Sequence, residues 1–379
     1  MNNITTGLMK LGHEVKVLTI FTQKHDLDFD CLPPEYATQT AIEGVFIDTS
    51  INLTDAFSNL VTRDSYNVSR FFSPDFDIKL TRLLKQQKFD VIHLESLFMT
   101  PYIASCRRHS HAQIVLRSHN LEFIIWERMA SSAKGIAKRA YLKYLSRKLR
   151  EYELAVIDEI DGIASISADD KEKYQALGCK KPITTIPFGI DISDYLVEEA
   201  DKPEISLFHL GSLDWKPNLE GILWFLDQVW KPVSDMYPNL KIYLAGRNIP
   251  DDILTPEIKN VEIIGEVEDA KDFMRSKTIM VVPLLSASGI RVKIIEGMAL
   301  GKAIVSTKVG AEGLDVEHGK HIMVGENAAE CREFISKLVD NPDHIKEMGR
   351  SARKLVEKTF ENNHISQKLE KFYNQLIGE

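Results

Sequence analysis

The chain has 379 residues, of which 44% are hydrophobic and 27% charged, the proportions of an ordinary globular protein long enough for two domains. Its formal net charge of -8 argues against a nucleic-acid binder held by bulk electrostatics, so we expect no nucleic-acid partner. The four cysteines are widely spaced and predict neither a zinc site nor a disulfide framework, which favours a cytoplasmic protein. No apolar run approaches the roughly 20 residues that a membrane helix needs.

The start of the chain is unusual for an α/β protein. A helix is expected over Met1–Leu11, ended by Gly12, and a strand over His13–Ile20. A doubly wound domain ordinarily begins instead with a strand and a Gly-rich loop, and that strand is central in its sheet. Loss of a central strand would leave buried backbone groups unpaired, at about 1–3 kcal/mol each. We therefore hypothesise that roughly 15–25 native residues precede Met1, a range set by strand and loop lengths.

The rest of the first half alternates short apolar strands with helical stretches, which is the pattern of a parallel α/β sheet. The expected strands are Val45–Asp48, Val91–Leu94, Ile114–Arg117 and Gly162–Ile166. The expected helices are Phe76–Gln86, Phe98–Arg108, Lys134–Ile157 and Ala168–Leu177.

The second half repeats this alternation after a polar run, Glu198–Glu204, where we place the domain boundary. The expected strands are Ser206–Leu210, Lys241–Ala245, Val261–Ile264, Ile279–Pro283, Ala303–Ser306 and His321–Val324. The expected helices are Pro217–Met236, Ala270–Ser276, Arg291–Leu300, Ala328–Leu338 and His344–Thr359. The fold class is therefore α/β, with two tandem doubly wound, Rossmann-like parallel-sheet domains at 1–190 and 201–356. A C-terminal helix within 357–379 is expected to pack back on the first domain.

The segment Lys134–Arg150 holds seven basic residues and no acidic one, a local reversal of the net charge. Lys138, Lys143 and Arg147 follow one another at about one-turn intervals and form a stripe on the expected helix. Beside an anionic membrane each such cation contributes about 1 kcal/mol. We expect a peripheral contact with the inner face of the cell membrane, and a solvated helix face is the alternative.

A strand–turn–helix–strand unit runs from Ile279 to Thr307, with a small-residue turn at 286–289. The turn directs unpaired backbone N–H groups and the positive end of a helix to one point, which favours an anion. Lys293 and Glu296 lie three residues apart on one face of this helix. A phosphate cradle with a cation and a hydroxyl-binding carboxylate is what a nucleotide-sugar site requires. The alternative is a surface ion pair contributing about 0.2–0.5 kcal/mol.

Several further motifs occur in a specific order and spacing. Those of the first half are Leu11-Gly-His-Glu-Val15, Arg117-Ser-His-Asn-Leu-Glu122, Trp126-Glu-Arg128 and Pro187-Phe-Gly-Ile-Asp191. Those of the second half are Leu210-Gly-Ser-Leu-Asp-Trp-Lys-Pro-Asn218, Ala245-Gly-Arg247, Ile264-Gly-Glu-Val267 and the segment from Ser286 to Leu314. Over nearly its whole length the chain thus resembles the retaining glycosyltransferases of family 4, which have the GT-B fold. The resemblance implies a metal-independent hexosyltransferase without a cofactor. It would use a nucleotide diphosphate sugar as donor and a glycan or lipid-linked acceptor, in surface polysaccharide or glycolipid synthesis.

The resemblance also implies roles for individual residues. Donor-binding roles fall on Gly211, Ser212, Arg247, Val267, Ser288, Gly289, Arg291, Lys293 and Glu296. Glu296 would bind the ribose hydroxyls, while Lys293 and Arg291 would face the diphosphate, at about 1.5–3 kcal/mol for each charge-assisted bond. The catalytic candidates are Lys293 and His119, which matches a histidine near the transferred sugar. Acceptor-side candidates are Asn120, Glu122 and Arg128.

Two positions depart from the family's pattern. Ser288 stands where the family often has a glutamate for the donor sugar, and Ser212 stands where it often has an arginine. Arg247 is the candidate for the missing positive charge. Two other functions stay open at this point: a nucleotide-sugar epimerase, which would act on free UDP-sugar without an acceptor, and a non-catalytic nucleotide-sugar-binding partner.

Overall fold

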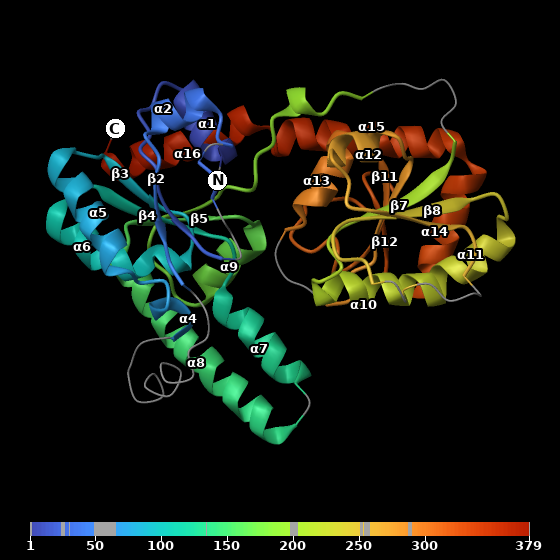
Figure 1. The fold of residues 1–379 in the computed structure, drawn as a ribbon, viewed down its shortest axis with the longest axis horizontal. Coiled ribbons are helices and arrows are strands. Elements are labelled where there is room, and N and C mark those ends of the chain that lie inside the picture. The colour runs from blue at the N-terminus through green and yellow to red at the C-terminus, as the bar shows by residue number, and fades with distance from the viewer. Residues whose placement is uncertain are drawn as a thin grey trace. The chain divides into compact units, whose positions relative to one another are not determined.

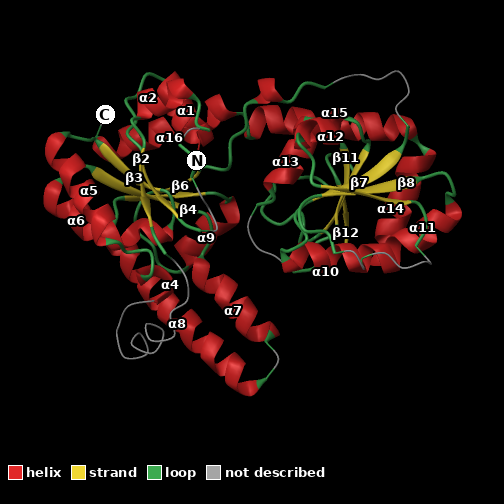
Figure 2. Ribbon diagram, viewed as in Figure 1, coloured by secondary structure: helices red, strands yellow, loops and turns green. Residues whose placement is uncertain are grey.

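The computed structural model describes residues 2–23, 27–29, 31–48, 66–133, 135–197, 204–250, 253, 258–286 and 290–378. Its contacts divide the chain into two compact units: Met1–Pro187 together with Ile365–Glu379, and Phe188–His364. In each unit the strands lie between layers of helices (Figures 1 and 2). All strand pairs in the three sheets are parallel, which confirms the predicted α/β class. None of the described helices combines the length and apolarity needed to cross a membrane.

The first unit contains two sheets. One pairs β1 (Leu18–Phe21) with β2 (Glu43–Phe46), and the other has the order β3 (Val91–Leu94), β4 (Gln113–Ser118), β5 (Gly162–Ser165) and β6 (Ile183–Thr185). Within the described residues β1 and β3 each have one strand neighbour, so each has an edge at which another strand could pair. The hypothesis of a preceding strand stays a prediction.

Helices cover both faces of the four-stranded sheet because the side chains of a strand alternate between the faces. Ile114 and Leu116 of β4 belong to a buried cluster on one face, and Val115 belongs to another on the opposite face. The first cluster is built with α5 (Pro74–Gln86), α6 (Ile103–His109) and α8 (Ile136–Glu159). The second is built with α1 (Asn2–Lys10) and α16 (Asn362–Ile377). The C-terminal end of the chain therefore completes the core of the first unit.

The first unit also contains shorter helices. They are α2 (Pro34–Thr40), α4 (Tyr66–Ser69), α9 (Ala168–Ala176) and the 3-10 turn η1 (Leu97–Tyr102). A second 3-10 turn, η2 (Ile192–Asp194), belongs to the second unit. A further helix, α7 (Glu122–Ser132), runs beside α8, and the pair extends away from the sheet as a helical hairpin (Figure 1).

The second unit has one six-stranded sheet in the order β12-β11-β10-β7-β8-β9. The strands are β7 (Ser206–Leu210), β8 (Lys241–Ala245), β9 (Val261–Gly265), β10 (Ile279–Val282), β11 (Ala303–Thr307) and β12 (Met323–Gly325). Strands β8 and β9 lie on one side of β7. Strands β10, β11 and β12 lie on its other side. The strand order thus reverses between β7 and β10, and ligands of such sheets bind at the carboxyl ends of strands beside this point.

Helices lie on both sides of this sheet (Figure 1). One layer holds α10 (Lys216–Phe225), α11 (Lys231–Met236) and α14 (Ala328–Asp340), and the other holds α12 (Ala270–Arg275), α13 (Val292–Ala299) and α15 (Pro342–Thr359). Side chains along each strand again alternate between the two faces of the sheet. Ile279 and Val281 of β10 belong to the buried cluster on the face covered by α10 and α14.

Some predicted elements differ from the structure. The expected strand His13–Ile20 pairs only from Leu18, where the register with β2 begins. The helix expected from Lys134 begins at Ile136, because Gly135 has a φ of +94°, a value that favours glycine and breaks the helix. The single helix expected over Pro217–Met236 contains a π turn, Leu226–Trp230, ahead of Pro232. Helices α2, α4 and α7 and strand β6 were not predicted.

Candidate functional site

The carboxyl ends of β7 and β8 meet through two glycines. Gly211, directly after β7, donates its N–H to the carbonyl of Ala245 at 2.9 Å. Gly246 has a φ of +142°, and a Cβ on it would lie 2.0 Å from the carbonyl oxygen of Gly211. Only a residue without a side chain fits there, so the two strand ends are held at close approach.

Lys293 reaches the same point from α13. Its Nζ donates to the carbonyl of Leu210 at 3.1 Å and to Oδ1 of Asn218 at 3.2 Å. A Cβ on Gly211 would lie 2.9 Å from this ammonium, so the glycine leaves the space that Lys293 needs. Burial, reinforced by the charge of Arg291, lowers the pKa of Lys293 to about 8. The structure thus holds a cation at the strand-order reversal, as the sequence predicts for a phosphate site.

Two residues beside Lys293 had no predicted role. Asn218, in the first turns of α10, donates Nδ2 to the carbonyl of Ser212 at 2.9 Å, which leaves Oδ1 to face Lys293. His209 is buried in β7, and its Nδ1 donates to the carbonyl of Val281 at 3.1 Å. Its Nε2 has no hydrogen-bond partner among the described residues. Burial and the charge of Lys293 lower the pKa of His209 to about 3, so the imidazole is neutral.

The other predicted cations of the second unit lie differently. Arg291, at the start of α13, is buried, and its guanidinium carbon is 5.9 Å from the centre of the Trp215 ring. Burial lowers the pKa of Arg291. Arg247 is 72% exposed and forms an ion pair with Glu266 at 2.6 Å, so its charge is already partnered.

The remaining donor-site candidates of this unit lie on loops. Ser212 donates its hydroxyl to Asp214 at 2.6 Å. Val267 lies half-buried in the loop after β9. Ser288 and Gly289 lie outside the described residues, so the departure at Ser288 from the family's pattern rests on the sequence.

Glu296 is held by residues that sequence analysis did not single out. The Tyr195 hydroxyl donates to Oε1 of Glu296 at 2.9 Å, and the Lys271 ammonium lies 4.6 Å from the centre of the Tyr195 ring. Burial raises the pKa of Glu296, while the Tyr195 hydrogen bond and the Lys271 charge oppose the rise. Lys293 and Glu296 therefore bond to different partners, which argues against the alternative of a simple ion pair between them.

In the first unit, the candidates follow the end of β4. Nε2 of His119 lies 3.0 Å from Oε1 of Glu95, a residue that directly follows β3 and was not predicted. Burial raises the pKa of Glu122, while the neighbouring His119 and Asn120 oppose the rise. Arg128 is exposed and lies six residues further along α7, about 9 Å along the helix axis. The structure thus brings His119, Asn120 and Glu122 together on one short loop and places Arg128 further out.

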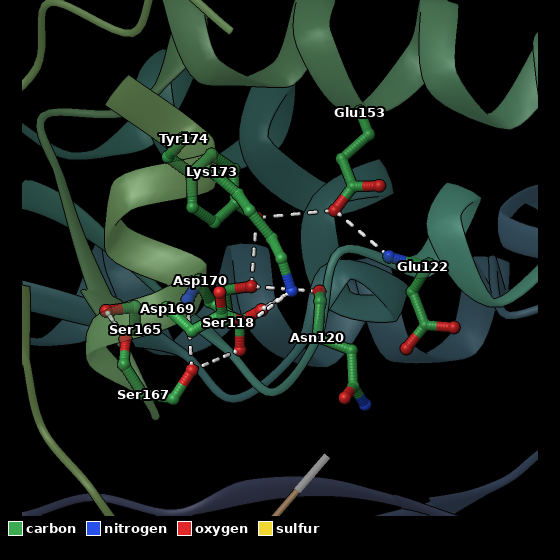
Figure 3. A network of polar contacts seen from close by, with 10 residues as sticks. All are labelled: Ser118, Asn120, Glu122, Glu153, Ser165, Ser167, Asp169, Asp170, Lys173 and Tyr174. Carbon is green, nitrogen blue, oxygen red and sulfur yellow. Dashed lines mark hydrogen bonds and ion pairs between the residues drawn. The ribbon is translucent and has the colours of Figure 1, made fainter. Parts of the chain in front are cut away.

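A buried polar network supports this loop (Figure 3). Glu153 of α8 accepts the N–H groups of Glu122 and Phe123 at 3.4 and 3.3 Å, and the Tyr174 hydroxyl at 3.3 Å. The same hydroxyl lies 2.9 Å from Oγ of Ser118, which donates to the carbonyl of Asn120 at 3.0 Å. Burial raises the pKa of Glu153 to about 8. The loop is therefore fixed at its strand end and at its helix end.

Comparison with known proteins agrees with this architecture. Residues 1–194 match the family described as Glycosyltransferase Family 4, and residues 204–341 match the family described as Glycosyl transferases group 1. The chain is 20% identical over 297 residues to an uncharacterized 44.6 kDa protein in the cps region of Klebsiella pneumoniae, which covers 76% of this chain and 75% of that protein.

Solved structures share the fold at low sequence identity. Sucrose-phosphate synthase from Thermosynechococcus elongatus superposes with a TM-score of 0.68 at 16% identity, over 99% of this chain and 92% of that one. HepE of Anabaena in complex with UDP superposes with a TM-score of 0.67 at 12% identity, over 95% and 100%. The two-domain fold is accordingly GT-B, as the resemblance implied. Because the first family match spans more than half of its length, the chain belongs to glycosyltransferase family 4, the group 1 enzymes that use nucleotide-sugar donors.

Proposed function

We propose that the chain transfers a hexose-type sugar from a nucleotide diphosphate donor, with retention, to a glycan or lipid-linked acceptor. The observation that carries the proposal is the ammonium of Lys293, held within hydrogen-bonding distance of the end of β7 at the strand-order reversal. The start of α13 adds the positive end of a helix near the same point. Glu296, on the same helix, then takes the ribose hydroxyls.

UDP is the first donor nucleotide to test. HepE, which shares the fold, has been solved with UDP and with UDP-glucose. The acceptor assignment has a different support, since the related Klebsiella protein comes from a cps region. The cps region favours an enzyme of surface polysaccharide synthesis, which we place in the cytoplasm.

The proposed reaction breaks the bond between the anomeric carbon and the diphosphate oxygen and forms a bond to an acceptor hydroxyl on the same face. The acceptor proton passes to the leaving diphosphate. Lys293 and the start of α13 stabilise the charge that develops on that diphosphate. His119 positions the transferred sugar, so orientation and electrostatics together lower the barrier.

Product analysis tests the proposal. We expect consumption of UDP-glucose, or of another UDP-hexose, that requires an added glycan or lipid-linked acceptor and persists in a metal chelator. The anomeric proton coupling of the product in NMR should match that of the donor. An epimerase would convert the free donor without an acceptor, and a non-catalytic partner would bind the donor without consuming it. Either of these results would contradict the proposal.

We also propose that the α7–α8 hairpin contacts an anionic membrane. Near its tip, Ile136 is 90% exposed, and the exposed Lys138, Lys143 and Arg147 follow along α8. An apolar tip flanked by cations suits the boundary between acyl chains and anionic headgroups. Lys134, the first residue of the predicted basic segment, lies outside the described residues.

Vesicle sedimentation tests this contact. Changing Lys138, Lys143 and Arg147 to Glu should abolish binding to phosphatidylglycerol-containing vesicles. The matched control changes Arg82, Lys85 and Lys88 to Glu. These are three exposed cations, two in the last turns of α5 and Lys88 just beyond it, and the net-charge change is the same. Equal binding by both triple variants would contradict the hairpin as the contact surface.

A further inference from the structure

Glu95 links two histidines at the end of the four-stranded sheet. Its Oε1 lies 3.0 Å from Nε2 of His119, and its Oε2 lies 2.9 Å from Nε2 of His93. The buried guanidinium of Arg117 lies 3.6 Å from the same carboxylate. One half-buried carboxylate therefore connects β3, β4 and the loop that carries His119.

The charge of Glu95 determines which atoms carry hydrogens. Burial opposes its ionisation, but the hydrogen bonds from His119 and His93 outweigh burial and hold the pKa of this carboxyl well below its usual range. An ionised carboxylate can only accept hydrogen bonds, so both histidines carry a hydrogen on Nε2. A neutral imidazole in this form has its acceptor lone pair on Nδ1.

The other nitrogen of His93 extends the chain of hydrogen bonds to the C-terminal helix. Nδ1 of His93 lies 2.5 Å from the hydroxyl of Tyr373 in α16. Burial raises the pKa of Tyr373, so its hydroxyl keeps its hydrogen and donates it to His93. A continuous series of hydrogen bonds therefore joins Tyr373 of α16, His93 of β3, Glu95 directly after β3 and His119 directly after β4.

A metal site is the other arrangement in which two histidines and a carboxylate meet. Among the described residues, no group of three or more His, Cys, Asp or Glu side chains is arranged to hold a metal ion. The distances around Glu95, 2.9 and 3.0 Å, are those of hydrogen bonds between nitrogen and oxygen.

We propose that Glu95 is the positioning residue for His119, fixing the imidazole in the Nε2–H tautomer so that Nδ1 accepts a hydrogen bond from a hydroxyl of the transferred sugar. Tyr373 acts through His93 to hold the second oxygen of Glu95. The role assigned to Nδ1 rests on the proposed function, whereas the tautomer is a property of the protein alone.

The tautomer can be measured without substrate. In the full chain labelled with 15N-histidine, long-range 1H–15N correlation spectra distinguish Nε2–H from Nδ1–H rings. The His119 signals are assigned by their loss in His119→Asn. We expect a single Nε2–H form for His119 in the wild type. In Glu95→Gln we expect a mixture of tautomers for His119 or His93, because a neutral amide oxygen cannot replace both carboxylate contacts. Glu95→Asp should restore at least part of the single form.

A matched control removes another histidine–carboxylate pair in the same unit. His13 and Glu370 lie 2.8 Å apart at the surface, and Glu370→Gln should leave the His119 signals unchanged. If Glu95→Gln fails to fold, Tyr373→Phe tests the same series of hydrogen bonds at His93, whose Nδ1 signal should shift on losing its partner while the Nε2–H form remains. Unchanged histidine spectra in both variants would overturn the proposal.

Kinetics separate this inference from the proposed function. For an active enzyme, Glu95→Gln should lower kcat by at least about tenfold, because a wrong tautomer removes the acceptor atom. UDP affinity should not change, since the predicted nucleotide contacts lie on the second unit. If no sugar transfer is found with any donor, the spectra still decide whether Glu95 fixes His119. A kcat equal to that of the wild type would contradict the proposed role of Nδ1.

Discussion

Lys293 is a partly buried cation whose charge depends on its surroundings. Burial and the neighbouring Arg291 bring its pKa from the ordinary 10.5 to about 8. A bound diphosphate would add negative charge beside Nζ and raise that pKa again. Protonation of Lys293 and binding of the nucleotide are therefore thermodynamically linked.

The affinity for UDP should consequently depend on pH in a defined window. Below pH 8 the lysine is already charged, so the affinity is constant there. Above pH 8 the free protein must take up a proton on binding, and the dissociation constant should rise by up to about tenfold per pH unit until the pKa of the complex is reached. Titration calorimetry from pH 7 to 9.5 measures this. A flat profile in the wild type, or the same profile in Lys293→Met, would contradict the linkage.

The free acceptor capacity of Glu296 predicts that the protein recognises the ribose of the nucleotide. Its Oε1 accepts from Tyr195, which leaves acceptor capacity on the carboxylate for sugar hydroxyls. Wild-type protein should bind UDP about tenfold more tightly than 2′-deoxyuridine diphosphate, the effect of one charge-assisted hydrogen bond. Glu296→Ala should remove this preference. Tyr195→Phe keeps the carboxylate and should retain the preference, so its loss in both variants would point to a collapsed site instead.

At the scale of elements, the start of α7 depends on a buried carboxyl group. Glu153 of α8 receives the first N–H groups of α7, and burial raises its pKa to about 8. The unfolded chain loses this proton near the ordinary pKa of 4.5, so the folded state binds one proton more between pH 4.5 and 8. The free energy of unfolding should therefore fall as pH rises through that window.

Glu153→Gln tests this dependence, because the amide is nearly isosteric and does not titrate. Chemical denaturation from pH 5 to 8.5, followed by far-UV circular dichroism, should give a shallower pH slope in the variant. Glu159→Gln, at an exposed position of the same helix, is the control and should keep the wild-type slope. A wild-type slope in Glu153→Gln would contradict the assignment.

Elements with strong local signals could be predicted from the sequence. The strand Ser206–Leu210 has the predicted bounds, and α13 begins within one residue of its prediction, because apolar runs and turn residues act over short distances. The interruption at Leu226–Trp230 could not be predicted, since a π turn differs from an α-helix by one hydrogen-bond register.

At the scale of the whole molecule, the partners of the predicted site residues come from distant segments. His93 and Tyr373 are 280 residues apart, and Tyr195 and Glu296 are 101 apart. Residue type and spacing identify Lys293 and Glu296 as candidates, and the resemblance to the family adds His119. The groups that hold them are determined by the fold, so periodicity and local motifs carry no signal for them.

Each of the two units contains some of the predicted site residues. The first unit holds His119 with Glu95, and the second holds Lys293 with Asn218. For the second unit we propose that α13 supplies the cation for the donor diphosphate. Lys302 provides a matched control, because its ammonium also bonds to backbone carbonyls and burial also lowers its pKa to about 8. It directly precedes β11, at the amino end of the strands and away from the predicted site.

Calorimetric titration of UDP into the wild type, Lys293→Met and Lys302→Met tests this claim most directly. Loss of one charge-assisted contact of about 1.5–3 kcal/mol predicts a dissociation constant about 10- to 100-fold higher in Lys293→Met. Lys302→Met should bind UDP like the wild type, even if it is less stable. GDP and ADP are titrated in parallel as the other donor nucleotides. Equal affinity in Lys293→Met and wild type, or no binding of any of the three nucleotides by the wild type, would contradict the account.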